Sequence, residues 1–209
     1  MRSVLISIRP KWCELIANGK KTIEVRKTRP KLETPFKCYI YCTKDSKAQF
    51  WKASTYSYLD NHSHNAFDKC GNGKVIGEFV CDTIKHFDSA FDEYARSTAP
   101  GGSIINSMGW KKFLEVVEKK ARITKEELEK YFPEDVRAYL WHISELKIYD
   151  DPIELSEFMA KPCVFAASCG ACNHSMWNHD NCNQFVDCSF SVKRPPQSWC
   201  YVEEVTQDD

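Results

Sequence analysis

The chain has 209 residues, of which 43% are hydrophobic and 13% aromatic, enough to form one domain with insertions around a buried core. Its 29 basic residues balance 29 acidic ones, so the protein as a whole has no electrostatic attraction to nucleic acid or to an anionic membrane. No stretch approaches the roughly 18 apolar residues of a membrane span, and Arg2, Arg9 and Lys11 interrupt the first apolar run, which argues against a secretory signal. These features predict a cytoplasmic protein with no membrane partner.

The charge is unevenly distributed along the chain. Residues 1–31 carry nine basic side chains and two acidic ones, a net charge of +7, whereas the last nine residues carry four acids and no base. This polarity indicates one basic face and an acidic tail. On composition alone, a basic face that only meets solvent is the more common outcome.

The predicted elements begin with a strand over residues 3–8 and a helix over residues 10–18. Pro10 suits the first turn of a helix because it has no N–H to lose there. Trp12, Leu15 and Ile16 recur at intervals of three to four residues and give this helix one apolar face. Gly19 ends it, because glycine adopts the left-handed conformation that a helix end often needs.

Strands separated by two insertions follow the helix. Residues rich in β-branched and aromatic side chains predict strands over residues 22–26, 36–42, 74–87, 139–149 and 198–205. The first of these alternates polar and apolar residues, as a half-buried strand does, and Gly77 permits a bulge or bend in the long strand. The insertion over 44–72 is polar and rich in turn residues, and the insertion over 88–137 is helical, with a capping box formed by Thr124 and Glu127.

This order of elements predicts an α+β fold. Helices do not alternate with strands at regular spacing, which argues against a doubly wound parallel sheet. We expect a small mixed or antiparallel β-barrel with peripheral helices and an inserted helical segment. The barrel domain covers residues 1–160, a cysteine-rich module follows over 161–192, and a terminal strand with an acidic tail completes the chain over 193–209.

The segment from Pro10 to Arg26 carries a recognisable pattern, in which Lys11, Glu14, Leu15 and Ile16 precede Gly19-Lys20-Lys21-Thr22-Ile23-Glu24-Val25-Arg26. It resembles the signature of the ASCH domain, a branch of the PUA-like superfamily. The wider sequence resembles an ASCH-containing group of bacteria and their phages, on the strands KVIGEFVCD and WHISELKIYD and the terminal motif RPPQSWCYVEE. The resemblance covers residues 1–43, 74–86, 139–160 and 193–205.

The resemblance implies a PUA-like barrel with a cleft beside the first helix and a role in handling RNA or modified nucleobases. Some small ASCH proteins are amidohydrolases that remove an acyl group from N4-acetylated cytidine, using a lysine that matches Lys21 and a threonine that matches Glu24. Here Glu24 replaces that threonine, and a carboxylate is not the hydroxyl nucleophile that the mechanism assigns. A third family residue, a glutamate, falls in the helical insertion, where Asp92 and Glu93 are positional candidates.

Lys21, Glu24 and Arg26 are the central candidates for a site. Glu24 and Arg26 are two apart on a strand and therefore share one face. The planar guanidinium of an arginine can form two hydrogen bonds to a phosphate or to the edge of a guanine, and the carboxylate of a glutamate can accept a hydrogen bond from an exocyclic amine. If burial lowers the lysine pKa, Lys21 would instead act as a base while Glu24 orients water. The alternative without function is a surface ion-pair ladder on an edge strand.

Further binding candidates surround these three. Cations and an aromatic ring suit single-stranded nucleic acid, where bases stack and phosphates pair, and the candidates of this kind are Lys11, Trp12, Lys20, Thr22 and Arg29. Trp12 also fits the apolar face of its helix, and Tyr39, Tyr41 and Trp141 are assigned to packing within the barrel.

Six of the eleven cysteines lie after residue 160, which favours a metal site there. Cys169 and Cys172 have the spacing of a zinc knuckle, and Cys182 and Cys188 would complete a tetrahedral set. Substitute ligands within reach are Cys163, His174 and His179. A structural zinc would explain how a polar segment folds without a core of its own, and the alternative is a loop of reduced thiols. Ordinary buried or semi-buried thiols are predicted for Cys13, Cys38, Cys42, Cys70 and Cys81.

Three functions remain open at this level. The first is binding of RNA, a nucleotide or a modified nucleobase through Lys21, Glu24 and Arg26, without catalysis. The second is an amidohydrolase acting on an N4-acylated cytidine-like nucleoside, with Lys21 and Glu24 as its catalytic residues. The third is a phage-associated accessory protein that binds a protein partner through its cysteine-rich module.

Overall fold

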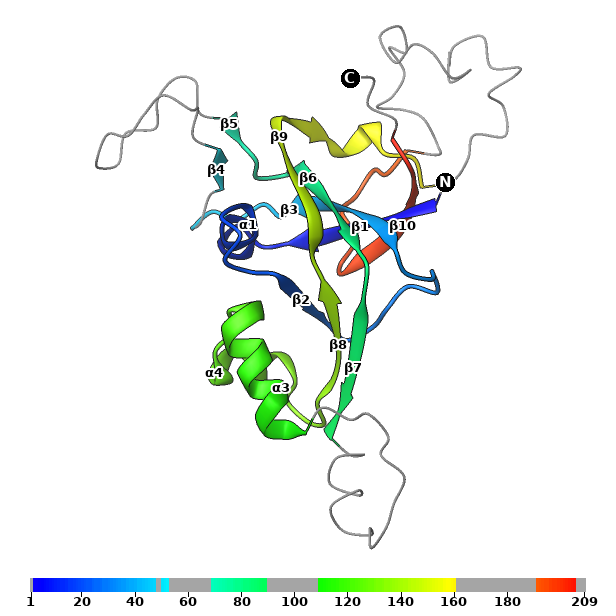
Figure 1. Cartoon of the computed structure of the whole chain (residues 1–209). Helices are drawn as coiled ribbons and strands as arrows, with labels where there is room; N and C mark the ends of the chain where they lie inside the picture. The colour runs from blue at the N-terminus through cyan, green and yellow to red at the C-terminus, as the bar shows by residue number, and fades with distance from the viewer. Residues whose placement is uncertain (1, 48–49, 53–68, 90–108, 161–190, 206–209) are drawn as a thin grey trace, which may run out of the picture. The chain divides into compact units, whose positions relative to one another are not determined.

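The computed structural model describes residues 2–47, 50–52, 69–89, 109–160 and 191–205 (Figure 1). The chain forms two compact units, each assembled from separate stretches of sequence. The first comprises Met1–Cys13, Lys37–Glu78 and Lys147–Asp209, and the second comprises Glu14–Phe36 and Phe79–Leu146. Within the described ranges, the helices are all too short or too polar to cross a membrane.

A five-stranded sheet organises the first unit. Its strand order is β10-β1-β3-β6-β9, with bounds of Trp199–Glu203, Arg2–Ile8, Phe36–Cys42, Lys74–Cys81 and Ser144–Glu154 respectively. The sheet is mixed, because β1 runs antiparallel to β10 and parallel to β3. One cluster of its core contains Leu5, Tyr39, Tyr41, Val75, Tyr149, Phe158, Val192 and Val202. The buried positions of Tyr39 and Tyr41 confirm that these rings serve packing.

Shorter elements accompany this sheet. Helix α1 spans Pro10–Ala17, one residue shorter than predicted. The short strands β4 (Trp51–Lys52) and β5 (Lys69–Cys70) pair antiparallel near the ends of the predicted polar insertion. A single 3₁₀ turn, η2 (Leu155–Glu157), follows β9.

A three-stranded antiparallel sheet organises the second unit. Its order is β2-β8-β7, with bounds of Ile23–Arg26, Arg137–His142 and Ile84–Asp88. Apolar side chains from one face, including Val25, Leu140 and Phe87, form a core with the helices beside them (Figure 1). Those helices are α3 (Trp110–Val116), the π-turn η1 (Val117–Ala121) and α4 (Lys125–Tyr131). The rings of Phe87 and Phe113 stack with centroids 4.1 Å apart.

The helical character predicted for residues 88–137 is confirmed over its described part. Thr124 caps α4, since its side chain accepts from the Glu127 N–H at 3.2 Å while the Glu127 carboxylate accepts from the Thr124 N–H at 3.1 Å. The predicted capping box is therefore present, and it satisfies two N–H groups that the helix itself leaves without a partner.

Two predicted strands were wrong in extent, because each changes sheet part-way. The strand predicted over 74–87 divides at Asp82–Thr83 into β6 and β7, and the one predicted over 139–149 divides at Ile143 into β8 and β9. Hydrogen bonds join the two breaks, from the His142 N–H to the Thr83 carbonyl at 2.9 Å and from the Ser144 hydroxyl to the Val80 carbonyl at 2.8 Å. Residues that favour strands resume directly after each break, so the sequence alone does not reveal that the strand changes sheet.

Gly77 permits a close approach of two strands, where a bulge or bend was predicted. A Cβ at this position would collide with the Lys147 carbonyl oxygen on β9 and would lie 3.1 Å from the Ile148 Cα. Glycine is required because a neighbouring backbone occupies the space of a side chain. Mixed α+β content with two main sheets is thus established, and closure of the strands into a barrel remains a prediction.

Candidate functional site

The end of α1 delivers Lys21 to the start of β2. Gly19 has φ +66°, the left-handed conformation predicted for it. Its turn is closed by hydrogen bonds from the Lys20 and Lys21 N–H groups to the Leu15 carbonyl, both at 2.9 Å. This fixed turn sets the direction in which the Lys21 side chain leaves the backbone.

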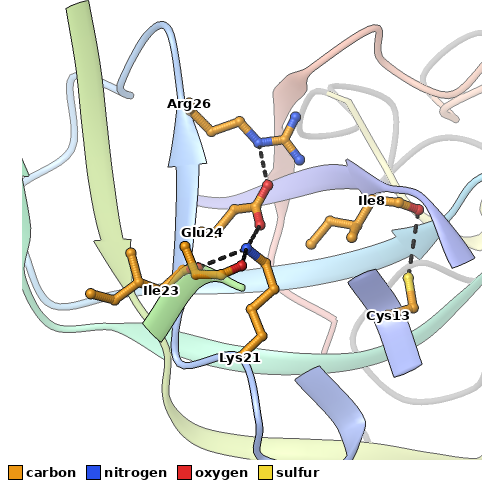
Figure 2. Close-up of polar contacts among 7 residues, drawn as sticks. Ile8, Cys13, Lys21, Ile23, Glu24 and Arg26 are labelled. Atoms are coloured by element: carbon orange, nitrogen blue, oxygen red, sulfur yellow. Dashed lines mark hydrogen bonds and ion pairs between the residues drawn. The ribbon is translucent and has the colours of Figure 1, made fainter. Parts of the chain in front are cut away.

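The Lys21 ammonium is surrounded by acceptors. Its side chain is 1% exposed, and Nζ donates to the carbonyl oxygens of Ile23 at 2.8 Å and Ala121 at 2.9 Å. The third neighbour is Glu24, whose Oε2 lies 3.1 Å from Nζ (Figure 2). An ammonium has three N–H donors, so these three acceptors match the protonated lysine.

The π-turn η1 supplies part of this environment. The carbonyl of its last residue, Ala121, accepts from Lys21, and the carbonyl of Lys120 accepts from the Thr22 N–H at 2.9 Å. Arg122 follows with φ 58°, and its Nε donates to the Lys20 carbonyl at 2.9 Å. A π-turn often marks a functional position in a helix, and here it aims backbone oxygens at the residues around Lys21.

Glu24 joins Lys21 to Arg26. While its Oε2 contacts Lys21, its Oε1 lies 3.0 Å from the Arg26 Nε. Figure 2 shows the Arg26 guanidinium beside the Glu24 carboxylate, with a dashed line from Nε to Oε1. Glu24 and Arg26 are thus joined as an ion pair at the Nε edge, where the geometry is not that of a hydrogen bond.

The prediction that β2 is only half-buried is wrong. Glu24 and Arg26 are each 7% exposed, and the alternate residues Ile23 and Val25 are buried in the core on the other face. The three side chains do share one place, as predicted, but as a buried ion-paired group rather than a surface ladder. Burial changes the energetics, because charges out of water interact more strongly and are screened less by salt.

The pKa of Lys21 reflects two opposed effects. Burial lowers the pKa of its ammonium below the ordinary value, and the Glu24 carboxylate, through its charge and its hydrogen bond, raises it again. Burial is the larger effect on the pKa. The three acceptors around Nζ favour its protonated form, in which Lys21 serves as a donor.

The other predicted binding residues have different surroundings. Lys20 and Arg29 are exposed, and the Arg29 guanidinium donates to the Pro30 and Leu32 carbonyls of its own loop, both at 3.2 Å. Thr22 is half-buried and contributes its backbone to the turn. Lys11 and Trp12 belong to the first unit, where the Lys11 Nζ lies 4.4 Å from the centre of the Trp12 ring.

The predicted zinc ligands Cys169, Cys172, Cys182 and Cys188 lie outside the described residues, as do Cys163, His174, His179, Asp92 and Glu93. In the described part of the chain, no group of three or more His, Cys, Asp or Glu side chains is arranged to hold a metal ion. The five cysteines predicted as thiols form no disulfide, and all are buried except Cys70, which is partly exposed.

Sequence reasoning missed the contribution of η1. The Ala121 and Lys120 groups that contact the site are backbone carbonyls, and a main-chain acceptor leaves no signature in the identity of its residue. The nearest signal is the basic run from Lys119 to Arg122 at the end of a helical pattern, which indicates a helix C-terminus.

The family profile of the ASCH domain matches residues 6–147, which is more than half of the chain. The chain belongs to the ASCH domain family. This establishes a PUA-like fold, and ASCH domains are in general of a nucleic-acid-binding type. The matched residues include the whole Lys21–Glu24–Arg26 group.

Solved structures agree with this fold. The ASCH protein of Zymomonas mobilis is similar to this chain with a TM-score of 0.53 and 15% sequence identity, over 97% of this chain and 88% of that one. Two single-residue variants of the same protein match with TM-scores of 0.52 and 0.50, each at 15% identity and over 97% of this chain, covering 89% and 91% of theirs. A search of curated proteins found no match. At this identity the likeness bears on the fold alone.

Proposed function

We propose that this ASCH domain binds RNA, a nucleotide or a modified nucleobase through the group formed by Lys21, Glu24 and Arg26. The observation that carries the proposal is the position of the Arg26 guanidinium in a buried ion-paired group. The Glu24 carboxylate lies 3.1 Å from the Lys21 ammonium and 3.0 Å from the Arg26 Nε, at a place almost closed to water. Charges out of water interact strongly, and a planar guanidinium is suited to a nucleotide phosphate.

The geometry also supports binding through Arg26. The ion pair with Glu24 favours one direction of the Arg26 guanidinium before any ligand arrives. Pre-organisation of this kind lowers the entropy lost on binding, and a planar fork matches the two oxygens of a phosphate or the O6 and N7 of guanine. The other basic residues of the first 31 add long-range attraction for an anionic chain.

Catalysis of the amidohydrolase type is less well supported. Lys21 would have to give up a proton to act as a base, yet its three donors meet three acceptors. The residue at the position of the family threonine, Glu24, is itself held between two cations. Both features suit a fixed binding group better than a proton-transfer pair, and no feature of the described residues favours a protein partner for the cysteine-rich segment over a nucleic acid.

Binding assays test the proposal. Fluorescence anisotropy with a short labelled single-stranded RNA should show affinity that falls steeply with salt, because cation–phosphate contacts release counterions. Arg26→Ala should weaken binding at least tenfold, in the range of about 1–3 kcal/mol for a bidentate contact. The matched control is Lys112→Ala, which removes an exposed cation from α3 and should have little effect. Salt-insensitive binding, or equal affinities for the two variants, would overturn the proposal.

A further inference from the structure

The sheet β2-β8-β7 places further side chains on the face that carries Glu24 and Arg26. Arg26 lies directly opposite Tyr139 on β8, and Tyr139 lies directly opposite His86 on β7. Residues directly opposite one another in antiparallel strands point to the same side of the sheet. Arg26, Tyr139 and His86 therefore form one row across the sheet, on the face opposite the one that packs against the helices.

The outer part of this row is an aromatic pair that solvent reaches. The rings of His86 and Tyr139 lie with centroids 4.7 Å apart and planes inclined by 30°, and His86 is exposed while Tyr139 is half-buried. Two residues before Tyr139 on the same strand, and so on the same face, Arg137 extends a side chain that is 67% exposed. Its Nε lies 3.4 Å from the Oδ2 of Asp88, which holds the guanidinium beside the ring pair.

We propose that this row extends the binding site along a single-stranded nucleic acid, with a base stacking on His86 and a phosphate pairing with Arg137. The inference rests on the proposed function of Arg26 and adds the class of its ligand, an oligonucleotide. Proteins commonly bind a single strand with aromatic rings interspersed with cations. The bases stack on the rings, and the backbone phosphates pair with the cations.

The spacing of the row discriminates between ligands. Neighbouring strands lie about 4.8 Å apart, so His86, two strands from β2, stands roughly 10 Å from Arg26. A ligand contacts both positions only if it extends along the row. We therefore infer that an oligonucleotide uses the whole row, whereas a mononucleotide held by Arg26 does not depend on His86 or Arg137.

The experiment compares two probes on the same variants. Affinities are measured for a labelled oligouridylate of about ten nucleotides, within the usual site size of proteins that bind single strands, and for uridine 5′-monophosphate by calorimetry. His86→Ala should weaken oligonucleotide binding about tenfold, and His86→Phe, which keeps a ring, should restore most of it. Arg137→Ala should weaken oligonucleotide binding several-fold. It should also reduce the slope of log affinity against log salt concentration by about one, the change expected when one phosphate contact is lost.

Lys85→Ala is the matched control. Lys85 is an exposed cation next to His86 on β7, and because successive residues of a strand alternate, its side chain lies on the other face of the sheet. It should change oligonucleotide affinity far less than Arg137→Ala. A cross-strand ring pair that only stabilises the sheet would lower the melting temperature in His86→Ala without changing affinity, and that result would overturn the inference.

The two proposals fail in different ways. If Arg26→Ala abolishes mononucleotide and oligonucleotide binding while His86→Ala and Arg137→Ala bind the oligonucleotide normally, the row is not a binding surface and the proposed function stands. If the unaltered protein binds neither probe, the proposed function fails and the extension falls with it.

Discussion

The Glu24 carboxylate forms ion pairs with two cations. Its Oε1 lies 3.0 Å from the Arg26 Nε, and its Oε2 lies 3.1 Å from the Lys21 Nζ. One carboxylate thus connects the residue that anchors the turn after α1 to the residue whose guanidinium we propose as the ligand-binding group. On our proposal, structural and binding roles are divided among the three side chains, and substitutions should separate them.

Lys21 should be the structural member of the group. Lys21→Met removes a donor from two buried carbonyls and from Glu24, and breaking a buried charge pair typically costs about 3–5 kcal/mol of unfolding free energy. Urea unfolding should therefore show a large loss of stability at neutral pH. The control is Lys20→Met at the exposed neighbouring position, expected to change stability by about 0.5 kcal/mol or less. Similar losses for both variants would show that the acceptors around Nζ contribute nothing.

Tyr39 should make the stability of the protein depend on alkaline pH. Burial raises the pKa of its phenol to about 12 from an ordinary value of 10, and its hydroxyl accepts from the Val205 N–H at 2.9 Å. Between these two pH values the unfolded chain has lost the proton and the folded chain keeps it. The folded state therefore binds more protons there, and stability falls as pH rises through this interval. Below pH 10 the contribution is fully present.

The variant Tyr39→Phe isolates that effect. It keeps the ring in the core and lacks the titrating group, so the decline of its unfolding free energy above pH 10 should be shallower than that of the unaltered protein. The pH titration of tyrosinate absorbance in the folded state gives an independent measurement. An ionisation of Tyr39 near pH 10 would contradict the prediction.

The sequence predicts the elements that depend on local chemistry better than the contacts between distant segments. The helix over residues 10–18, its end at Gly19 and the capping box at Thr124 depend on local chemistry, and each was predicted within one residue. The places where β6 passes into β7 and β8 into β9 depend on hydrogen bonds between distant segments, such as His142 to Thr83. The pattern of strand-favouring residues carries no sign of such bonds.

The candidate site shows the same division. Two-residue spacing correctly predicted that Glu24 and Arg26 share a face, and Lys21 does join them. Their burial was not predictable, because polar residues on alternate positions of a strand normally indicate a solvent-facing side. The carbonyl of Ala121, one hundred residues from Lys21 in sequence, is a contact that only the folded chain brings together.

Gly77 should tolerate no side chain. In Gly77→Ala the new methyl group would meet the Lys147 carbonyl and Ile148 across the pairing of β6 with β9, so the strands must separate or shift. Overpacking of this kind typically costs about 1–3 kcal/mol. Gly109→Ala is a matched control, since a Cβ there meets nothing within 4 Å. Thermal unfolding should separate the two variants, and equal melting temperatures would show that the sheet adjusts without cost.

The cysteine-rich segment is expected to bind one zinc ion through Cys169, Cys172, Cys182 and Cys188, a prediction that lies outside the described residues. Structural zinc sites are usually tetrahedral, with four cysteine or histidine ligands, and such a site would explain how a segment of about 25 mostly polar residues folds without a core of its own. Elemental analysis of protein purified without a metal-binding tag should give about one zinc per chain.

Substitutions test which cysteines bind the metal. Cys172→Ser should lose the zinc, because a hydroxyl is a poor substitute for a thiolate ligand. Cys70→Ser, at a free and partly exposed thiol, should retain it. Chelation should release the zinc and make four further thiols reactive to a thiol reagent. A metal-free preparation in which the thiols of this segment react at once would instead show an ordinary loop of reduced cysteines.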